Sequence, residues 1–233
     1  MIIWTTMAYD IFFLSYNETN ADSNWSHLQS ISPTARRVDG IMGLHAAHQE
    51  CAKRSFTSHF FVVDADNIIT DPSVFDYKIP VYDTAYVHLW FAANPVNGLA
   101  YGWGGLKLFP KAVFDTINTH SIDMTTSFAL KIIPEVASTT AFNSTPYDTW
   151  RSAFREAAKL TRGIMVDPSC DENCARLDAW KTADPQSLNA KWAIRGAYDG
   201  EAYARMTHEL PSINNWAWLK QEFHSRYVDV VKI

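Results

Sequence analysis

Two aspartates, one residue apart, close a strongly apolar stretch of the chain. Residues 60–64 read Phe-Phe-Val-Val-Asp, and Asp66 follows after one alanine. Such a run is typical of a central strand that is buried on both faces. If the backbone stays extended, the side chains of Asp64 and Asp66 point in the same direction. The pattern therefore predicts a pair of carboxylates at the carboxyl end of a buried strand, which is where open α/β sheets bind their ligands.

A carboxylate pair in this position has the chemistry of a metal site. Oxygen ligands suit Mg²⁺ or Mn²⁺ shared with substrate phosphates, so we predict Asp64 and Asp66 as the metal ligands of a nucleotide-sugar enzyme. A cation here neutralises charge on the leaving group, which makes Asp66 a catalytic residue as well. Two interpretations compete. The aspartate can cap a turn through Asn67, or it can be the nucleophile of an aspartyl-phosphate phosphatase, although such enzymes commonly carry Thr where this chain has Ile68.

Polar residues also follow the first apolar segment. Residues 10–16 predict a buried strand. Ser15, Tyr16 and Asn17 would then lie at the same edge of the sheet as Asp64, and a flat ring with hydroxyl and amide groups suits a nucleobase. Ordinary turn residues fit the same pattern equally well.

A glycine-bearing segment precedes a predicted helix. It contains, in order, Arg37, Gly40, Gly43, His45 and His48. The start of a helix presents free N–H groups and a positive dipole, which suit a pyrophosphate, and glycines allow a close approach. We predict Arg37, Gly43 and His45 near the ligand. His48 shares a helix face with His45 and fits either a ligand contact or a packing role.

Residues 94–110 combine a high density of glycine with aromatic residues. Three glycines surround Trp103, and Lys107 follows shortly after. The pattern predicts backbone that runs against a ligand, with Trp103, Gly104 and Lys107 as contacts to that ligand. A glycine-rich β-hairpin is the alternative.

An aspartate beside hydroxyl residues is the candidate base of the reaction. Asp123 precedes Met-Thr-Thr at residues 124–126. In an inverting transferase one carboxylate must deprotonate the acceptor hydroxyl, and we predict this role for Asp123. A helix N-cap or a turn fits the residue about as well.

Basic residues recur at helical spacing in the second half of the chain. Arg151, Arg155, Lys159 and Arg162 fall in one row, opposite an apolar stripe of the same helix. The row predicts phosphate contacts, with Arg151, Arg155 and Lys159 as contacts to DNA. A solvated charged face is the alternative.

The composition limits the class of protein. At 233 residues, with 47% apolar and 19% charged residues, the chain suits one globular domain. The net charge of −5 excludes binding of nucleic acid through a generally basic surface, so any DNA contact is local and salt-sensitive. Three cysteines, Cys51, Cys170 and Cys174, provide no disulfide framework. The chain start lacks a basic signal-peptide region and no stretch approaches a membrane span, so we expect a cytoplasmic protein without membrane contact.

Strands and helices are expected to alternate in the first part of the chain. Expected strands cover residues 10–16, 36–38, 60–64 and 85–93, and expected helices cover residues 25–30, 45–54, 150–158, 173–182, 188–203 and 213–227. This order predicts an α/β fold with a mostly parallel sheet flanked by helices and a helical C-terminal part. Within a single domain over residues 1–233, the donor-binding half covers about residues 1–130 and the mainly helical part about 131–233.

In combination, these motifs resemble one family. The stretches that carry the resemblance are residues 10–16, 20–25, 37–48, 62–66, 94–110, 123–127 and 150–156. They are similar to the TET-associated-type DNA glycosyltransferases of bacteriophages, which are GT-A-like enzymes that glycosylate hydroxymethylated pyrimidines in DNA. The resemblance implies a GT-A-like fold, a UDP-sugar donor and a divalent cation at Asp64 and Asp66. It implies as acceptor a hydroxymethylpyrimidine in double-stranded DNA, with 5-hydroxymethylcytosine favoured.

The resemblance leaves several points open. It provides no clear third protein ligand for the cation, for which His208 and His224 are candidates. A UDP-sugar glycosyltransferase for a glycan, lipid or protein acceptor would share every donor-side motif. A non-catalytic nucleotide- or DNA-binding module would be expected to lack one of the two aspartates, and this chain has both. For a phage-encoded protein, the expected compartment is the host cytoplasm.

Overall fold

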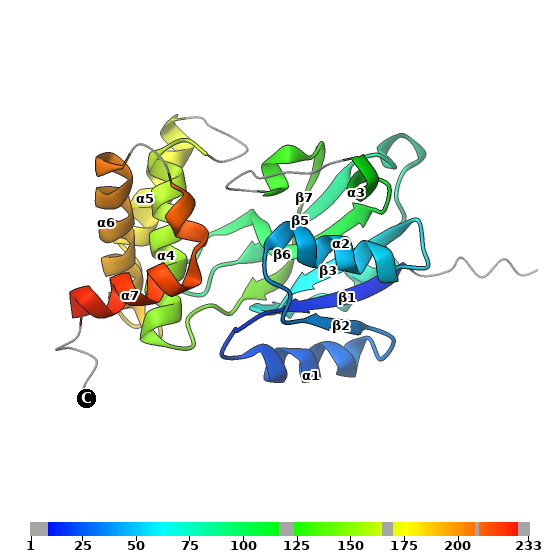
Figure 1. Ribbon diagram of the computed structural model, residues 1–233, viewed down its shortest axis with the longest axis horizontal. Helices are drawn as coiled ribbons and strands as arrows, with labels where there is room; N and C mark the ends of the chain where they lie inside the picture. The colour runs from blue at the N-terminus through cyan, green and yellow to red at the C-terminus, as the bar shows by residue number, and fades with distance from the viewer. Residues whose placement is uncertain (1–8, 117–123, 165–169, 208–209, 228–233) are drawn as a thin grey trace, which may run out of the picture. The chain divides into compact units, whose positions relative to one another are not determined.

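The computed structural model describes residues 9–116, 124–164, 170–207 and 210–227. These residues divide into two units, which we call the α/β unit and the helical unit (Figure 1). The α/β unit contains residues 9–93, 100–116 and 127–141. The helical unit contains residues 94–99, 124–126 and those from 142 onward.

A seven-stranded sheet is the frame of the α/β unit. Its strands are β1 (Asp10–Ser15), β2 (Arg36–Asp39), β3 (His59–Asp64), β4 (Asn67–Ile69), β5 (Val87–Ala93), β6 (Ala100–Pro110) and β7 (Leu130–Thr140). In space they follow the order β2-β1-β3-β6-β5-β7-β4. The pairs β2–β1, β1–β3 and β5–β7 are parallel, whereas β6 and β4 run antiparallel to their neighbours. With those two reversed, the other five of the seven strands share one direction, which confirms the α/β fold with a mostly parallel sheet.

One set of helices flanks the sheet, and a second set makes up the helical unit. The α/β unit has α1 (Ala21–Ile31), α2 (Leu44–Arg54), the short α3 (Val113–Thr116) and the 3₁₀ helices η1 (Pro72–Asp76) and η2 (Val81–Asp83). The helical unit has α4 (Pro146–Thr161), α5 (Cys170–Lys181), α6 (Ala190–Met206), α7 (Trp216–Tyr227) and the 3₁₀ helix η4 (Pro211–Asn214). A further 3₁₀ helix, η3 (Met124–Ser127), contains residues of both units. The helical C-terminal part is thus confirmed, and no helix in the described ranges is long and apolar enough to cross a membrane.

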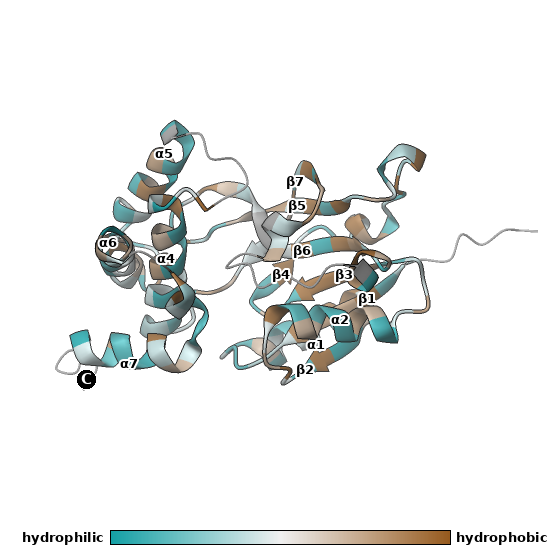
Figure 2. Ribbon diagram, turned by 45° about the horizontal axis from the view of Figure 1, so that its top comes forward, coloured by the Kyte–Doolittle hydropathy of each residue, from teal (hydrophilic) through white to brown (hydrophobic). Residues whose placement is uncertain are grey.

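The two faces of the central strands pack against different helices. Phe61 of β3 belongs to the core cluster that includes Leu28 of α1. Its neighbour Phe60 points to the other face, where it stacks on Phe109 of β6, and Phe109 contacts His48 of α2. Figure 2 shows the apolar colouring of β1 and β3 at the centre of this arrangement. The helices α1 and α2 therefore cover opposite faces of the sheet. Right-handed connections require this arrangement, because the step from β1 to β2 and the step from β2 to β3 run in opposite directions across the sheet.

The order β2-β1-β3 marks a place for a ligand. The strand that follows β1 in the chain lies on one side of it, and the next strand lies on the other side. Open sheets bind ligands at the carboxyl ends of the strands where the order reverses in this way. Ser15 and Asp64 are the last residues of β1 and β3, so both lie at this reversal point.

The last long strand, β7, lies where the sequence predicts a helical character from about residue 131. That prediction is wrong for residues 130–140. The register of β7 with β5 shifts between Ile133 and Val136. Pro134 lies within this irregularity, and irregularities of this kind are where a strand tolerates proline. A proline inside a segment usually argues against a strand, so the sequence does not indicate one here. The change to helical structure comes after Ala141 instead.

Close packing of α4 against α6 holds the helical unit together. The apolar stripe expected on α4 is confirmed, since Trp150, Ala153 and Phe154 are fully buried. The backbone of α6 approaches at Gly200, where a Cβ atom would lie 2.9 Å from the Cα and the carbonyl carbon of Phe154. Because backbone atoms cannot swing aside as a side chain can, this contact requires glycine.

Gly200→Ala is expected to lower the free energy of unfolding by about 1–2 kcal/mol, because overpacking outweighs the helix propensity that alanine gains. Urea unfolding followed by circular dichroism measures the change. Ala202→Ser adds one atom on the exposed side of α6 and is the matched control, with an expected change below about 0.5 kcal/mol. Equal stability of Gly200→Ala and the wild type would contradict the close approach of α4 and α6.

Candidate functional site

Polar residues end three neighbouring strands of the α/β unit. Ser15 of β1 is paired with Asp39 of β2, and Leu14 of β1 is paired with Asp64 of β3. Just beyond β3, the backbone N–H of Ala65 donates to the carbonyl of Leu14 at 2.9 Å. The structure therefore brings Ser15, Asp39 and Asp64 to the same end of the sheet, at the reversal point of the strand order, with Asp64 one residue below the level of Ser15 and Asp39.

Asp64 forms an ion pair with a residue of β6. The Oδ2 of Asp64 lies 3.4 Å from the Nζ of Lys107, and the two side chains are 32% and 8% exposed. Lys107 reaches this position because its strand pairs with β3, where it lies opposite Val62. Two residues that the sequence predicts for the site are thus in contact, with a buried ammonium group and a carboxylate that reaches solvent.

The strand β6 passes so close to Asp64 that one of its residues has to be glycine. A Cβ atom on Gly105 would lie 2.9 Å from the Cγ of Asp64, and closer still to the Cβ of Asp64 and the side-chain amide of Asn67. A side chain there would displace the carboxylate. The strands β5 and β6 pair as an antiparallel hairpin, so the hairpin interpretation of residues 94–110 is confirmed, and one of its glycines makes room for the aspartate.

Asp66 lies in the turn between β3 and β4, and a buried amide orients it. Its Oδ1 accepts a hydrogen bond from the Nδ2 of Asn67 at 2.9 Å. Asn67 is 2% exposed, and its own Oδ1 accepts hydrogen bonds from Ser138 at 3.2 Å and Thr140 at 3.3 Å. The strand β7 therefore fixes the group that orients Asp66. This turn contact is compatible with a metal site and with a simple turn.

The two aspartates supply part of a coordination shell. Among the residues that the structure describes, no group of three or more His, Cys, Asp or Glu side chains could hold a metal ion. Mg²⁺ binds through one or two carboxylates and completes its octahedron with phosphate oxygens and water, and Mn²⁺ accepts the same oxygen ligands. The donor set of Asp64 and Asp66 therefore fits a cation that binds together with a diphosphate. Of the candidates for a third ligand, His224 is exposed on α7, and His208 lies outside the described residues.

Ser15 and Arg37 belong to a hydrogen-bond network that ties β1 to β2. The Nε of Arg37 donates to the Oγ of Ser15 at 2.8 Å, and this Oγ donates to the Oδ1 of Asp39. The guanidinium of Arg37 also pairs with Asp22 at 2.6 Å and with Asp39 at 3.4 Å. These contacts hold the strand ends together, and contact of Ser15 and Arg37 with a donor stays a prediction.

Sequence reasoning missed Asp39. Its side chain is 56% exposed at the end of β2, beside Ser15, so its carboxylate faces the same edge of the sheet as Asp64. A carboxylate at the end of a strand is the signal that identified Asp64, and the same signal could have found Asp39. The short strand β2 lacks the apolar run that made β3 conspicuous.

Tyr16 and Asn17 follow β1 at the place that the sequence predicts. Tyr16 is half-buried, and its backbone N–H donates to the Oε2 of Glu18 at 2.8 Å. Asn17 is exposed. Their contact with a nucleobase stays a prediction.

The segment between β2 and α2 leads into a helix start without a side-chain cap. Gly43 is the N-cap residue with φ 95°, a conformation that favours glycine, and the helix has no side-chain hydrogen bond at this end. The N–H of Gly40 donates to the carbonyl of Ser15 at 3.1 Å, which fixes the segment to the end of β1. The first N–H groups of α2 are therefore available to an anion near the strand ends.

His45 lies in the first turn of α2. It is partly buried, and neither ring nitrogen has a hydrogen-bond partner among the described residues. Its ring centroid lies 6.2 Å from that of Phe114. This position fits a residue near the diphosphate, and its contact with a ligand stays a prediction.

His48, one turn further along α2, is a buried neutral base. It is 1% exposed, its Nδ1 lies 2.8 Å from the carbonyl of Leu44, and its Nε2 has no partner in the described part of the chain. Burial lowers the pKa of His48 to about 4. The negative charge of Asp64 opposes this shift, and the positive charge of Lys107 adds to it. His48 therefore packs against Phe109, on the face of the sheet to which Lys107 also points.

The buried histidine predicts an acid-sensitive component of stability. The pKa of His48 is about 4 in the folded protein against 6.5 unperturbed, so between these two pH values His48 binds more protons in the unfolded chain than in the folded one. The contribution of neutral His48 to the free energy of unfolding is therefore fully present above pH 6.5. It is lost as the pH falls toward 4, by up to about 3 kcal/mol. Urea unfolding between pH 4.5 and 7.5 should show a smaller pH dependence for His48→Phe than for the wild type. His224→Gln, on the exposed face of α7, should retain the wild-type dependence, and an unchanged dependence in His48→Phe would contradict the prediction.

Two predicted site residues are placed by their backbone alone, and a third is not placed. Trp103 and Gly104 belong to β6 by their backbone, and the structure does not describe the side chain of Trp103. Asp123, the candidate base, lies outside the described residues. Their roles stay predictions.

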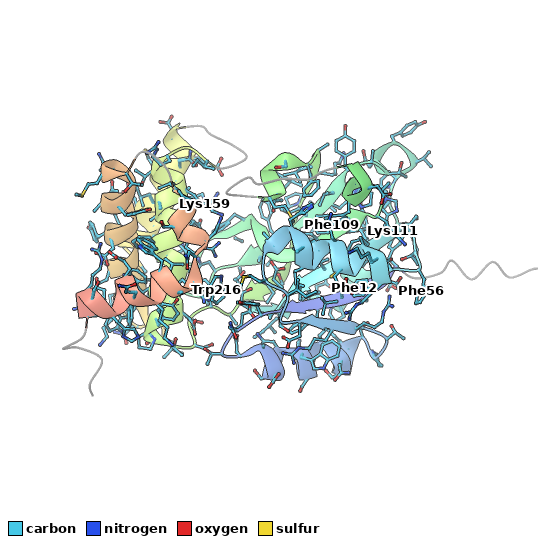
Figure 3. All side chains as sticks on the ribbon, viewed as in Figure 1. Phe12, Phe56, Phe109, Lys111, Lys159 and Trp216 are labelled. Carbon is cyan, nitrogen blue, oxygen red and sulfur yellow. The ribbon has the colours of Figure 1, made fainter. Side chains whose placement is uncertain are left out.

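The basic row of α4 does not form an open face. Arg151 is 5% exposed, and its guanidinium lies 3.8 Å from the ring centroid of Trp216, which Figure 3 labels together with Lys159. Arg155 donates from its Nε to the carbonyl of Ile213 at 2.8 Å. The prediction of Arg151 as a DNA contact is therefore wrong, because η4 and the start of α7 cover this part of the row. Lys159 is half-buried, and its contact with DNA stays a prediction.

Comparisons with known proteins give distant similarities in fold. No protein-family model and no curated protein matches the chain. The mannosyltransferase PcManGT from Pyrobaculum calidifontis, solved in complex with GDP-Man and Mn²⁺, aligns at 14% identity over 97% of this chain and 82% of that chain, with a TM-score of 0.45. HddC from Yersinia pseudotuberculosis aligns at 11% identity over 55% of this chain and 71% of that chain, with a TM-score of 0.35.

A third similar structure is a glycosyltransferase involved in the glycosylation of the major capsid of PBCV-1. It aligns at 17% identity over 46% of this chain and 62% of that chain, with a TM-score of 0.32. This chain thus spans less than two thirds of the length of that protein. Similarities at this level do not assign an activity.

Proposed function

We propose that the protein is a metal-dependent glycosyltransferase that uses a nucleotide-sugar donor. The observation that carries the proposal is the position of Asp64 and Asp66 at and just beyond the carboxyl end of β3, next to the end of β1 in the order β2-β1-β3. Two oxygen ligands at this reversal point suit a divalent cation shared with a diphosphate. In keeping with the family that the sequence resembles, the donor is a UDP-sugar and the cation is Mn²⁺ or Mg²⁺.

Each strand end has its own part in donor binding. Asp64 and Asp66 hold the cation, which when bound neutralises the charge that develops on the leaving diphosphate. The uncapped start of α2 at Gly43 binds the diphosphate through backbone N–H groups. Ser15 and the exposed carboxylate of Asp39, with the residues after β1, face the nucleoside.

The acceptor that we propose is the hydroxymethyl group of a modified pyrimidine in double-stranded DNA, with 5-hydroxymethylcytosine favoured. The group projects into the major groove, so the enzyme reaches it there or extrudes the nucleotide. Asp123 takes the proton of the hydroxyl, whose oxygen attacks the anomeric carbon of the sugar as the bond to UDP breaks. With a net charge of −5, the protein binds DNA weakly and in a salt-sensitive manner, through few contacts such as Lys159. If the protein is phage-encoded, the compartment that we propose is the cytoplasm of the host cell.

Mass spectrometry of nucleosides tests the proposal directly. DNA that contains 5-hydroxymethylcytosine is incubated with the protein, Mn²⁺ and a panel of UDP-sugars, and is then digested to nucleosides. We expect a new nucleoside that is heavier by one hexose or pentose residue, which also identifies the donor. Unmodified DNA is the control and should give no product.

A second acceptor class uses the same donor site. A glycosyltransferase for a glycan, lipid or protein would have the same residues at the ends of β1, β2 and β3. Metal-dependent hydrolysis of a UDP-sugar without a DNA product would favour this class or another modified base. Neither product nor hydrolysis with the full donor panel would favour a non-catalytic binding module.

A further inference from the structure

Lys107 has a buried side chain whose ammonium group makes few contacts. Its side chain is 8% exposed, and its Nζ lies 3.4 Å from the Oδ2 of Asp64, which is long for a charge-assisted hydrogen bond. Within the described ranges, this is the one hydrogen bond or ion pair that the side chain of Lys107 makes. An ammonium group carries three N–H donors. Lys107 therefore has donor capacity that its contacts in the folded chain do not use.

The surroundings of Lys107 explain why Asp64 holds it in place. Along β6, Lys107 and Phe109 point to the same face of the sheet. On that face Phe109 contacts the buried rings of His48 and Phe60. A charge among such groups is costly unless an opposite charge balances it. The carboxylate of Asp64 provides that balance.

The same carboxylate is the proposed metal ligand, so two cations share one partner. A divalent cation at Asp64 repels a nearby ammonium group and also competes for the oxygen atoms that it binds. Once Asp64 is engaged, Lys107 needs a different anion. The diphosphate of the donor is the anion that arrives at this place together with the cation.

We propose that Lys107 is the resident counter-ion of Asp64, that it competes with the divalent cation for this carboxylate, and that it then binds the diphosphate of the donor. The inference rests on the proposed function of the site. It gives the protein weak affinity for the cation alone and higher affinity for the cation and the diphosphate together. The reason is that the cation takes Asp64 away from Lys107, and the diphosphate then gives Lys107 a new anionic partner.

Lys107→Met tests both parts, because methionine keeps much of the apolar stem and removes the charge. Binding of Mn²⁺ to the protein without nucleotide, measured by electron paramagnetic resonance, should become about tenfold tighter than in the wild type. Binding of UDP in saturating Mn²⁺, measured by titration calorimetry, should become about tenfold weaker. Opposite changes in the two affinities are the expected signature.

Lys131→Met is the matched control. Lys131 also pairs with an aspartate of the α/β unit, Asp83, at 3.3 Å, and its side chain is 51% exposed. Both affinities of this variant should stay within about twofold of the wild type. Lys107→Arg keeps the charge and should keep the weak binding of Mn²⁺, so tighter binding of Mn²⁺ by Lys107→Arg would contradict a competition between charges.

The outcomes separate this inference from the proposed function. Unchanged or weaker binding of Mn²⁺ by Lys107→Met overturns the competition, and unchanged binding of UDP overturns the diphosphate contact. If the wild type binds Mn²⁺ and UDP and Lys107→Met binds them equally well, the inference alone fails. If the wild type binds neither, the proposed function fails as well.

Discussion

Asp64→Asn is expected to reduce sugar transfer by roughly a thousandfold or more, with the protein still folded. Asparagine keeps the shape of the side chain but lacks the negative charge that a divalent cation and Lys107 both require. The side chain of Asp64 is 32% exposed at the end of β3, so the substitution removes a ligand that solvent can reach. The measurement is the initial rate of transfer from the UDP-sugar that the nucleoside assay identifies, over a titration of Mn²⁺.

Asp71→Asn provides the comparison for this loss. Asp71 is an exposed aspartate of the same unit, and its Oδ1 accepts a hydrogen bond from the N–H of Ser73 at the start of η1, at 3.0 Å. Because asparagine caps a helix about as well as aspartate does, this replacement should change the stability by less than about 0.5 kcal/mol and leave the rate unchanged. Chelation of divalent ions should abolish transfer by the wild type, and added Mn²⁺ should restore it. Full activity of Asp64→Asn in saturating Mn²⁺ would show that the metal assignment is wrong.

The parts of the fold that the sequence predicts are those whose local pattern matches their burial. The strand β3 is buried on both faces, and its residues 60–63 are accordingly all apolar. The helix α4 buries one stripe, and its apolar residues recur at helical spacing. In β7 the burial changes along the strand and Pro134 interrupts the pattern. The sequence therefore shows neither the alternation of a strand nor the spacing of an amphipathic helix. The pairing of β7 with β5 on one side and β4 on the other makes it a strand.

The candidate site shows the same division between local and distant information. Asp64 and Asp66 are recognisable because two carboxylates follow one buried strand at close spacing. The contact of Asp64 with Lys107 depends on the register of β3 with β6, across 43 residues of chain. A local pattern cannot show such a register, although it did mark both residues separately.

Arg151 is the clearest case in which a local pattern was misleading. Its helical spacing from Arg155 and Lys159 is real, and the row lies off the apolar stripe as expected. What the spacing cannot show is that a later segment packs over it. The ring of Trp216 lies 3.8 Å from the guanidinium of Arg151, and this aromatic contact buries a cation that the helix alone would leave in solvent.

Gly105→Ala is expected to reduce the rate of transfer by about a hundredfold without removing any side chain of the site. The added methyl group would lie 2.9 Å from the Cγ of Asp64 and closer to its Cβ. Since β6 is held between β3 and β5, the backbone of the strand cannot withdraw, and the carboxylate has to move. A shift of about 1 Å at a metal ligand is enough to lose this much catalysis. Overpacking should also lower the free energy of unfolding by about 1–3 kcal/mol.

Gly102→Ala separates the loss of position from the loss of stability. It lies on the same strand, and its added methyl group would meet the end of the Leu89 side chain at 2.6 Å and the ring of Phe91 at 3.3 Å. We expect a loss of stability of about 1–3 kcal/mol, but an unchanged rate per folded molecule, because Asp64 is not displaced. Rates are compared at a temperature where unfolding curves show both variants fully folded. If Gly105→Ala and Gly102→Ala then have equal rates, Asp64 does not need the position that β6 gives it, and its role as a metal ligand loses its structural support.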